Sequence, residues 1–254
     1  MSQKKQNPSL GKPLVSVVIP TLPGRELILS RAIDSVMKQT YGYDNIQLLV
    51  VSNADLSAPQ ARNKGIEIAK GKYIAFLDDD DEWDATKIEM QVALMEQCPA
   101  CGLCITWLWD DRPGHNKVVM PKDNLTHRKI IKSFNLSSTS TYMVRTSTLY
   151  IFDGFDNDLA SGQEYDLAIR LSNWGSVRVI PRILAHQHAC EGQISANWFK
   201  KIRGILQLAF KYGHEYKPVD GVKTIGLCIV FTLGYMIGNR IYKLLSALKG
   251  VYEK

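Results

Sequence analysis

Cysteine is scarce in this chain of 254 residues, which excludes a disulfide-stapled scaffold. The five cysteines, Cys98, Cys101, Cys104, Cys190 and Cys228, are scattered. The first three have the CxxCxxC spacing of some zinc and iron–sulfur sites, but Cys104 falls in an expected buried strand and no fourth ligand is well placed. The pattern therefore favours small apolar residues in a reducing compartment over a metal centre.

Long hydrophobic runs are scarce too. Residues 225–238 form an uncharged stretch of fourteen residues, whereas a membrane-spanning helix needs roughly 20. Basic residues and tyrosines around it favour a helix lying in the membrane interface, the alternative being a helix packed in the core. The start of the chain carries no signal-peptide pattern, and residues 1–12 are expected to be a disordered N-terminus.

The positive charge is concentrated at one end. The net charge is +6, but residues 1–198 hold 21 basic and 22 acidic side chains, and residues 199–254 hold 10 basic and 3 acidic ones. A basic, apolar helical tail over 199–254 favours contact with an anionic membrane surface. We expect no nucleic-acid partner, because base-reading and stacking motifs are absent from the sequence.

Strands and helices alternate in the first half of the chain. Buried strands are predicted at 14–19, 46–51 and 72–77, with helices over 27–40 and 57–71 and a third helix that follows Asp84. This order predicts an α/β fold with a mostly parallel sheet between helices. A short helix near 127–134, strands at 139–144, 177–181 and 183–189, and a helix from Glu164 follow. We divide the chain into a domain over 13–198, with halves 13–108 and 109–198, and the tail.

Four consecutive aspartates, Asp78 to Asp81, follow the third strand. If the strand continued, Asp78 and Asp80 would point to one side, and Asp79 and Asp81 to the other. Neighbouring carboxylates stay ionised only with a counter-charge, which Mg²⁺ or Mn²⁺ would supply while leaving positions open for phosphate oxygens. Ligands of such sheets bind beyond the carboxyl ends of the strands. The run therefore predicts a metal site that receives a diphosphate, the alternative being a solvated acidic turn.

Four blocks in order resemble family 2 glycosyltransferases of the GT-A fold: "VSVVIPT", "SAPQARNKGIEIAKGKYIAFLDDDDEW", "GFDNDLASGQEYDLAIRL" and "HQHACEGQIS". The resemblance covers roughly residues 14–195 and implies sugar transfer from a nucleotide donor with inversion at the anomeric carbon. It implies that Asp80 and His188 hold the metal, with His186 as the competing histidine. The residues it assigns to the nucleotide are Pro20, Thr21, Asn53, Arg62, Asp78 and Asp79.

The resemblance places the catalytic base at the start of the helix in "SGQEYDLAIRL". Family members usually carry Glu-Asp there, whereas this chain has Gln163-Glu164, so Glu164 occupies the base position. Asp166 is the alternative base, unless it only favours the helix dipole. Trp83 either borders the sugar or belongs to the core.

Two departures from the family pattern concern the nucleotide. The second strand usually ends in Asp-Asp-Gly-Ser, but here Ser52 and Asn53 stand in those positions. Asn53 can still bond a base edge, although the identity of the base becomes less certain. The strand usually found before "ARNKG" is also missing.

The implied function is transfer from a UDP-sugar to a polyprenyl-diphosphate-linked glycan, in the synthesis of O-antigen, capsule or a similar surface polysaccharide. The enzyme would then sit at the cytoplasmic face of the inner or plasma membrane. Within the same class, the acceptor could instead be soluble or a protein. A non-catalytic sugar-nucleotide binder or partner subunit is the alternative from another class. A phosphoacceptor receiver domain is disfavoured because its partner lysine has no clear match.

Overall fold

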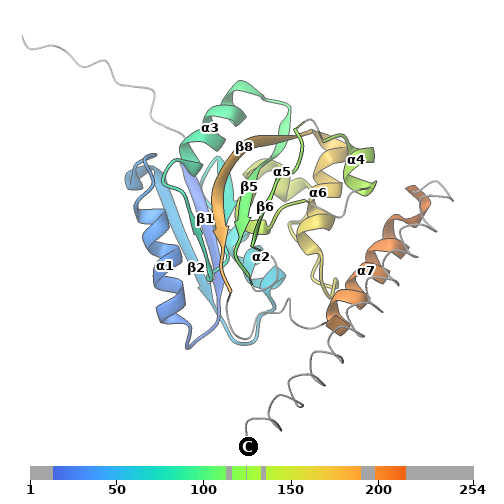
Figure 1. Cartoon of the computed structure of the whole chain (residues 1–254), viewed down its shortest axis with the longest axis horizontal. Coiled ribbons are helices and arrows are strands. Elements are labelled where there is room, and N and C mark those ends of the chain that lie inside the picture. The colour runs from blue at the N-terminus through green and yellow to red at the C-terminus, as the bar shows by residue number, and fades with distance from the viewer. Residues whose placement is uncertain (1–13, 113–115, 124, 133–135, 190–197, 216–254) are drawn as a thin grey trace, which may run out of the picture. The chain divides into compact units, whose positions relative to one another are not determined.

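The structure is a computed structural model, and it describes residues 14–112, 116–123, 125–132, 136–189 and 198–215. Figure 1 shows a central sheet with helices packed against it. In chain order the elements are β1 (Val15–Thr21), α1 (Glu26–Met37), η1 (Tyr43–Asn45), β2 (Ile46–Ser52), α2 (Ala58–Ile68), β3 (Tyr73–Phe76), β4 (Asp81–Trp83), α3 (Lys87–Gln97), β5 (Cys101–Asp110), β6 (Lys117–Val119), α4 (His127–Lys132), η2 (Thr139–Thr141), β7 (Met143–Arg145), α5 (Thr146–Ile151), α6 (Gln163–Trp174), β8 (Ser176–Gln187), α7 (Trp198–Tyr212) and η4 (Gly213–Glu215).

The first three strand–helix units form as predicted. Ser57 begins α2 with a capping box, in which Gln60 Oε1 accepts the Ser57 backbone N–H at 2.8 Å. The helix ends at Ile68, so Gly71 does not close it. Gly71 instead allows a close backbone approach, since a Cβ there would meet Ser16 N and Tyr73 O.

The sheet is mixed, and the prediction of a mostly parallel sheet was wrong in this respect. The strand order is β2-β1-β3-β7-β5-β8-β4, with β6 beside β5. β1 pairs in parallel with β2 and β3, and β5 pairs in parallel with β8. β7 enters between β3 and β5 antiparallel to both, and β4 and β6 also pair antiparallel. β4, β6 and β7 have three residues each, too few to show a hydrophobic period.

The segment 176–187 is one strand, β8, where two were predicted. Pro181 interrupts the sequence pattern but not the strand. Along β5 the partner residue moves from Ile180 to Ile183 as Thr106 gives way to Trp107. Pro181 and Arg182 lie in this irregularity, where the missing N–H of proline costs no ladder hydrogen bond.

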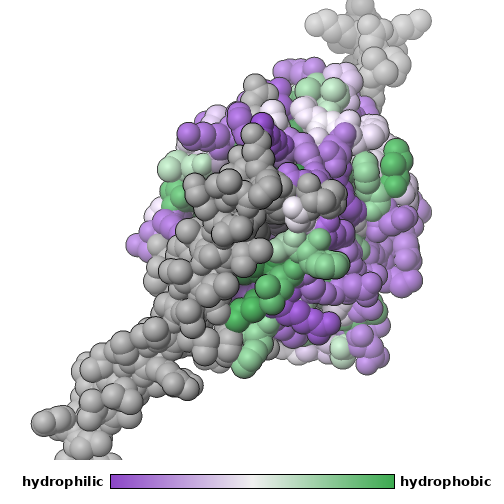
Figure 2. All heavy atoms as spheres, turned by 90° about the vertical axis from the view of Figure 1, so that its right-hand side faces the viewer, coloured by the Kyte–Doolittle hydropathy of each residue, from purple (hydrophilic) through white to green (hydrophobic). Residues whose placement is uncertain are grey.

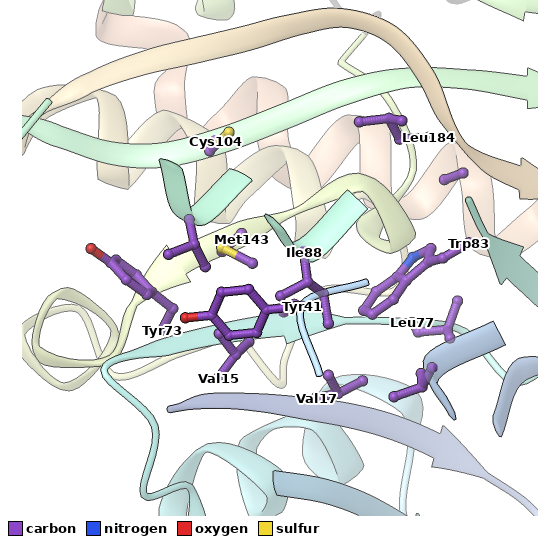
Figure 3. Close-up of a cluster of buried hydrophobic side chains, with 14 of the residues drawn as sticks. Val15, Val17, Tyr41, Tyr73, Leu77, Trp83, Ile88, Cys104, Met143 and Leu184 are labelled. Atoms are coloured by element: carbon purple, nitrogen blue, oxygen red, sulfur yellow. The ribbon is translucent and has the colours of Figure 1, made fainter. Parts of the chain in front are cut away.

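Helices cover both faces of the sheet because side chains alternate along β1 and β3. One face carries Val15, Val17 and Ile19, which share a buried cluster with side chains of α1 and α3. Figure 3 shows part of that cluster, including Leu77, Ile88 and Trp83. On the other face, Val18 lies against Gly65 of α2, and the Phe76 ring meets Phe155 edge-on at 5.0 Å. Both faces of β1 and β3 are therefore buried.

The chain divides into two compact units, one of residues 1–157 with 163–191 and one of 158–162 with 192–254. Within the described residues, no helix has the length and apolar character needed to cross a bilayer. The segment 225–238, for which an interfacial helix is predicted, lies outside the described residues, as do residues 1–12, Cys190 and Cys228.

The three described cysteines are free thiols. Cys101 and Cys104 lie buried in β5, and burial raises the pKa of Cys101 to about 11 and that of Cys104 still further. Both thiols therefore remain protonated near neutral pH and behave as small apolar side chains.

Candidate active site

The parallel strands β1, β2 and β3 end at the same edge of the sheet. Thr21 pairs with Ser52 at the ends of β1 and β2, and the Leu77 N–H donates to Val18 O at 3.1 Å just beyond β3. Thr21 Oγ1 then reaches the acidic run and donates to Asp79 Oδ2 at 2.6 Å. The expected convergence of strand ends is therefore present, with the acidic run at its centre.

The acidic run is a turn and not an extension of β3. The Asp81 N–H donates to Asp78 O at 3.1 Å, and β4 begins at Asp81. The predicted alternation of Asp78 and Asp80 against Asp79 and Asp81 was therefore wrong, because it assumed a strand. In the turn, Asp78 pairs with Arg62 and Asp81 bonds Ser140, while Arg25 lies near both Asp79 and Asp80. The two arginines reduce the repulsion between the carboxylates.

Asp79 is clamped by residues of the loop after β1. Arg25 donates through Nε to Asp79 Oδ2 at 2.7 Å and through Nη2 to Oδ1 at 2.8 Å. Together with the Thr21 hydroxyl, this bidentate pair engages both carboxylate oxygens. The clamp ties residues 21–25 to the acidic turn. Binding of the nucleotide by Asp79 remains a prediction, and the arrangement adds a positioning role.

Asp78, Arg62 and Glu164 come together from three different elements. Arg62 of α2 is buried, and its Nη2 lies 2.5 Å from Asp78 Oδ1. Its guanidinium also lies 5.4 Å from the centre of the Phe155 ring. Burial raises the pKa of Glu164 at the start of α6; the Arg62 charge opposes this shift and the Asp78 charge adds to it. The predicted base, the predicted phosphate partner and the first acid therefore share one electrostatic environment.

Asp81 faces away from solvent and is held by Ser140. Its side chain is fully buried, and Ser140 Oγ donates to Asp81 Oδ2 at 2.5 Å. The same hydroxyl accepts the Asp78 N–H at 3.1 Å, and Ser140 O accepts Trp83 Nε1–H at 2.7 Å. Burial, followed by the charges of Asp78 and Asp80, raises the pKa of Asp81 well above its usual range. The neutral form is thus favoured, which relieves charge in the turn.

Trp83 belongs to the core, which is one of the two roles that the sequence left open for it; the other was to border the sugar. It is 5% exposed, and the Lys87 ammonium lies 4.0 Å from the centre of its ring. Burial lowers the pKa of Lys87 to about 7. Because the buried lysine packs against the tryptophan ring, this side of the acidic turn is part of the protein core and not a surface that binds the sugar.

Asp80 and His188 lie just outside two paired strands. β4 begins at Asp81 and β8 ends at Gln187, and these two residues are opposite each other in the antiparallel pair. Asp80 directly precedes β4 and His188 directly follows β8. The two nitrogens of His188 lie near carboxylates, Nδ1 at 3.1 Å from Asp111 and Nε2 at 3.6 Å from Glu82. A carboxylate and an imidazole are suitable donors for Mn²⁺ or Mg²⁺, and the residues present fit such an ion.

Within the described residues, no group of three or more His, Cys, Asp or Glu side chains is arranged to hold a metal ion. Asp80 and His188 would therefore supply only part of a coordination shell. Oxygens of a diphosphate would complete it, as in sites where Mg²⁺ is held by few carboxylates and substrate phosphates. His186, the competing histidine, pairs with Glu82 in the sheet, and its charge acts on Asp84.

The other two nucleotide candidates lie at the same sheet edge. Pro20 is the penultimate residue of β1 and is buried. Asn53 is exposed just after β2, where its Oδ1 accepts the Asp55 N–H at 2.8 Å. Residues 53–57 connect β2 to α2 without a further strand, in agreement with the missing strand noted in the sequence.

Asp166 is a structural residue of α6 and does not face solvent. Its side chain is fully buried, and Arg170 Nε donates to Asp166 Oδ2 at 2.8 Å. Arg170 also donates to Phe152 O at 2.5 Å and Gly154 O at 2.7 Å. Asp166 therefore orients an arginine that anchors the loop before α6, which favours Glu164 over Asp166 as the base.

Three residues of the site were missed by sequence reasoning: Arg25, Arg112 and Ser140. Arg25 follows β1 in the turn "TLPGRE", and a cation at a strand end beside an acidic run was a usable signal. Arg112 binds both oxygens of Asp110 at 2.8 Å, and the charges of Asp81 and Asp80 help raise its pKa. Ser140 lies in a serine- and threonine-rich segment with no local feature that distinguishes it.

We expect Arg25→Gln to weaken nucleotide binding, because the loop after β1 loses its tie to Asp79. The Michaelis constant for the donor should rise about 5- to 10-fold with less than a twofold change in kcat, which is the signature of lost uniform binding. Steady-state kinetics and calorimetry measure both quantities. Arg128→Gln, on an exposed arginine of α4, is the matched control, and equal behaviour of the two variants would contradict the positioning role.

Ser140→Ala is expected to destabilise the protein by about 1–3 kcal/mol, because it leaves the buried Asp81 carboxyl without its donor. Urea unfolding measures the change. Ser137→Ala is the matched control, since Ser137 Oγ is buried without a hydrogen-bond partner in the described part of the chain. A similar small loss for both variants would show that the Ser140 hydroxyl does not support the turn.

Comparison with known proteins finds related sequences. The family model described as Glycosyl transferase family 2 matches residues 55–158. The UDP-Glc:alpha-D-GlcNAc-diphosphoundecaprenol beta-1,3-glucosyltransferase WfgD of Escherichia coli is 26% identical over 215 residues, which span 75% of this chain and 83% of that protein.

Two solved structures share the fold. S. aureus TarS in complex with UDP-GlcNAc has a TM-score of 0.66 at 14% identity, covering 85% of this chain and 71% of that one. The mannosyltransferase PcManGT from Pyrobaculum calidifontis, in complex with GDP-Man and Mn²⁺, has a TM-score of 0.59 at 12% identity, covering 92% and 81%. The likeness to these structures shows that the chain has an α/β GT-A-like fold with a mixed central sheet. Residues 55–158 match the glycosyltransferase family 2 model, and the chain resembles members of that family, as its sequence blocks predicted.

Proposed function

We propose that this protein transfers a hexose from a UDP-sugar to a hydroxyl of a polyprenyl-diphosphate-linked saccharide, with inversion, during synthesis of a surface polysaccharide such as O-antigen or capsule. The observation that carries the proposal is the meeting of Asp78, Arg62 and Glu164 at the carboxyl edge of the sheet. A cation suited to a diphosphate and a carboxylate suited to a proton in one electrostatic environment support the proposal.

Glu164 acts as the general base. Its carboxylate accepts the proton of the acceptor hydroxyl while that oxygen forms a bond to the anomeric carbon and the bond to the diphosphate breaks. The nucleoside diphosphate leaves with the bonding electrons on the opposite face, so the configuration inverts. Because burial raises the pKa of Glu164, this carboxylate accepts a proton more readily than an exposed one does.

Arg62 stabilises the negative charge that grows on the leaving diphosphate. In the structure its Nη2 pairs with Asp78 and its guanidinium lies over the Phe155 ring, while its buried Nε has no hydrogen-bond partner among the described residues. These contacts orient the side chain before the ligand arrives. Asp80 and His188 would hold Mn²⁺ or Mg²⁺, and that ion would supply further positive charge to the diphosphate. The manganese in the PcManGT complex supports this part of the proposal.

The donor and acceptor classes come from relatives. The name of WfgD specifies UDP-Glc and a diphosphoundecaprenol-linked acceptor, and the TarS complex contains UDP-GlcNAc. The basic segment 199–254 supports a location at the cytoplasmic face of the inner or plasma membrane, where such acceptors are reached. A soluble acceptor is the alternative.

The test is a transfer assay with a panel of UDP-sugars, with GDP-mannose for comparison, in the presence of Mn²⁺. The acceptor is a short polyprenyl-diphosphate saccharide, and the same saccharide without lipid is its control. We expect metal-dependent transfer to the lipid-linked acceptor with an inverted product by NMR. Transfer to the free saccharide alone would refute the lipid-linked acceptor, and tight nucleotide binding with no turnover would favour the non-catalytic binder.

A further inference from the structure

The helix α7, Trp198–Tyr212, has one face packed within its own unit. Gln207 bonds the segment 158–162 at both ends of its amide, donating to Asp158 O at 2.8 Å and accepting the Ala160 N–H at 2.9 Å. The Gly204 backbone lies so close to Ser161 that no side chain would fit there, and Leu208 touches Gly162. These contacts define the inner side of the helix.

The opposite side of α7 is apolar and exposed. Phe199, Leu206 and Phe210 are 67%, 57% and 92% exposed. Their spacing of seven and four residues places them on one stripe of the helix, and Gly204 and Leu208 fall on the other side at 3.6 residues per turn. Large apolar side chains in a row on an outer face mark an interaction surface more often than scattered ones do.

The charged side chains of α7 have a single sign. α7 contains four basic residues and no acidic one; the basic residues are Lys200, Lys201, Arg203 and Lys211. All four are exposed. Figure 2 shows one face of the molecule, on which apolar and hydrophilic residues lie next to one another. At 3.6 residues per turn, Arg203 lies about 40° from the stripe, Lys200 and Lys211 about 100–120° away on the same side, and Lys201 farther round the helix. An apolar stripe on a helix whose charged side chains are all cations is complementary to an anionic lipid surface, which accepts both components at once.

We propose that the Phe199–Leu206–Phe210 face of α7 docks onto an anionic lipid bilayer, lying in the interface plane. The sequence predicted membrane contact for the tail 199–254, with an interfacial helix at 225–238. The proposal assigns docking to a defined face of α7, at the start of that tail. The biological role of this docking rests on the proposed function, because an enzyme with a lipid-linked acceptor reaches it from the membrane surface. Docking itself is measured without any sugar transfer.

The experiment is co-sedimentation of the full chain with vesicles of phosphatidylcholine, with and without 30% phosphatidylglycerol, a composition chosen as roughly that of an anionic leaflet. We expect binding to the anionic vesicles that weakens as salt is raised. The triple variant Phe199→Ser, Leu206→Ser, Phe210→Ser should bind at least about 10-fold more weakly, given the apolar area it removes. The matched control Leu27→Ser, Ile151→Ser, at 89% and 60% exposed positions outside α7, should bind as the unmodified chain does.

Undiminished binding of the triple variant would overturn the proposal, and so would equal binding to neutral and anionic vesicles or no binding to either. Phe210→Ser alone, at the most exposed position, is the second variant, and it should lose several-fold affinity if the triple variant does not fold. Metal-dependent hydrolysis of the soluble donor separates the two proposals: the triple variant should retain it. If the unmodified chain showed no turnover at all, the proposed function would be refuted, but the measured vesicle binding would still stand.

Discussion

Replacing Glu164 with glutamine is expected to lower kcat for sugar transfer by roughly 100- to 10,000-fold, which is the usual contribution of a positioned general base. The amide has the same shape but cannot accept the proton of the acceptor hydroxyl. Nucleotide binding should be unchanged, because Arg62 and Asp78 are untouched. Transfer assays and calorimetry with UDP measure the two effects separately.

The matched substitution is Glu67→Gln, which changes an exposed glutamate of α2 that pairs with Lys64 at 2.8 Å. It should leave both quantities within twofold of the unmodified protein. If Glu164→Gln retained full turnover, another group would have to take the proton. Asp166 is the sequence alternative, but its carboxylate is buried against Arg170.

The pH dependence follows from the same carboxylate. Burial raises the pKa of Glu164 above its usual value of 4.5, and the base is active only when deprotonated. Activity is therefore expected in full above the raised pKa and to fall as pH drops through it, so the acid limb of kcat/KM lies above pH 4.5. Because the Arg62 charge lowers this pKa, Arg62→Gln should move the limb to higher pH. An unmoved limb would assign the titration to another group.

Asp80→Asn is expected to have the second large effect. The amide removes the negative charge that would hold the cation beside the diphosphate, and charge stabilisation by such an ion is worth several kcal/mol. We therefore expect kcat/KM to fall by at least about 100-fold. We also expect manganese to lose its ability to tighten UDP binding, which calorimetry measures without any turnover.

Asp44→Asn, at an exposed aspartate of η1, controls for a general loss of negative charge. His188→Gln should weaken the manganese effect in the same direction, because His188 supplies the other donor. Manganese-enhanced UDP binding that survives in Asp80→Asn would contradict the assignment of Asp80 to the metal.

Several parts of this molecule were determined by its sequence alone. The hydrophobic runs of β1, β2 and β3 and the capped start of α2 at Ser57 depend on interactions within a few residues, so local patterns predicted them. The position of the acidic run follows from the end of β3. The place of Glu164 at the start of α6 follows from the block that contains it. These features needed no knowledge of remote contacts.

Only the tertiary structure decided how distant segments meet. Thr21 and Asp79 are 58 residues apart, and Ser140 and Asp81 are 59 apart. No local period encodes either contact: the first depends on the pairing of β1 with β3, and the second on the insertion of β7 beside β3. The turn that separates the four carboxylates has the same origin: Arg25, Arg62 and Ser140 reach it from three other elements. The sequence indicated which residues carry charge, and packing decided which charges face one another.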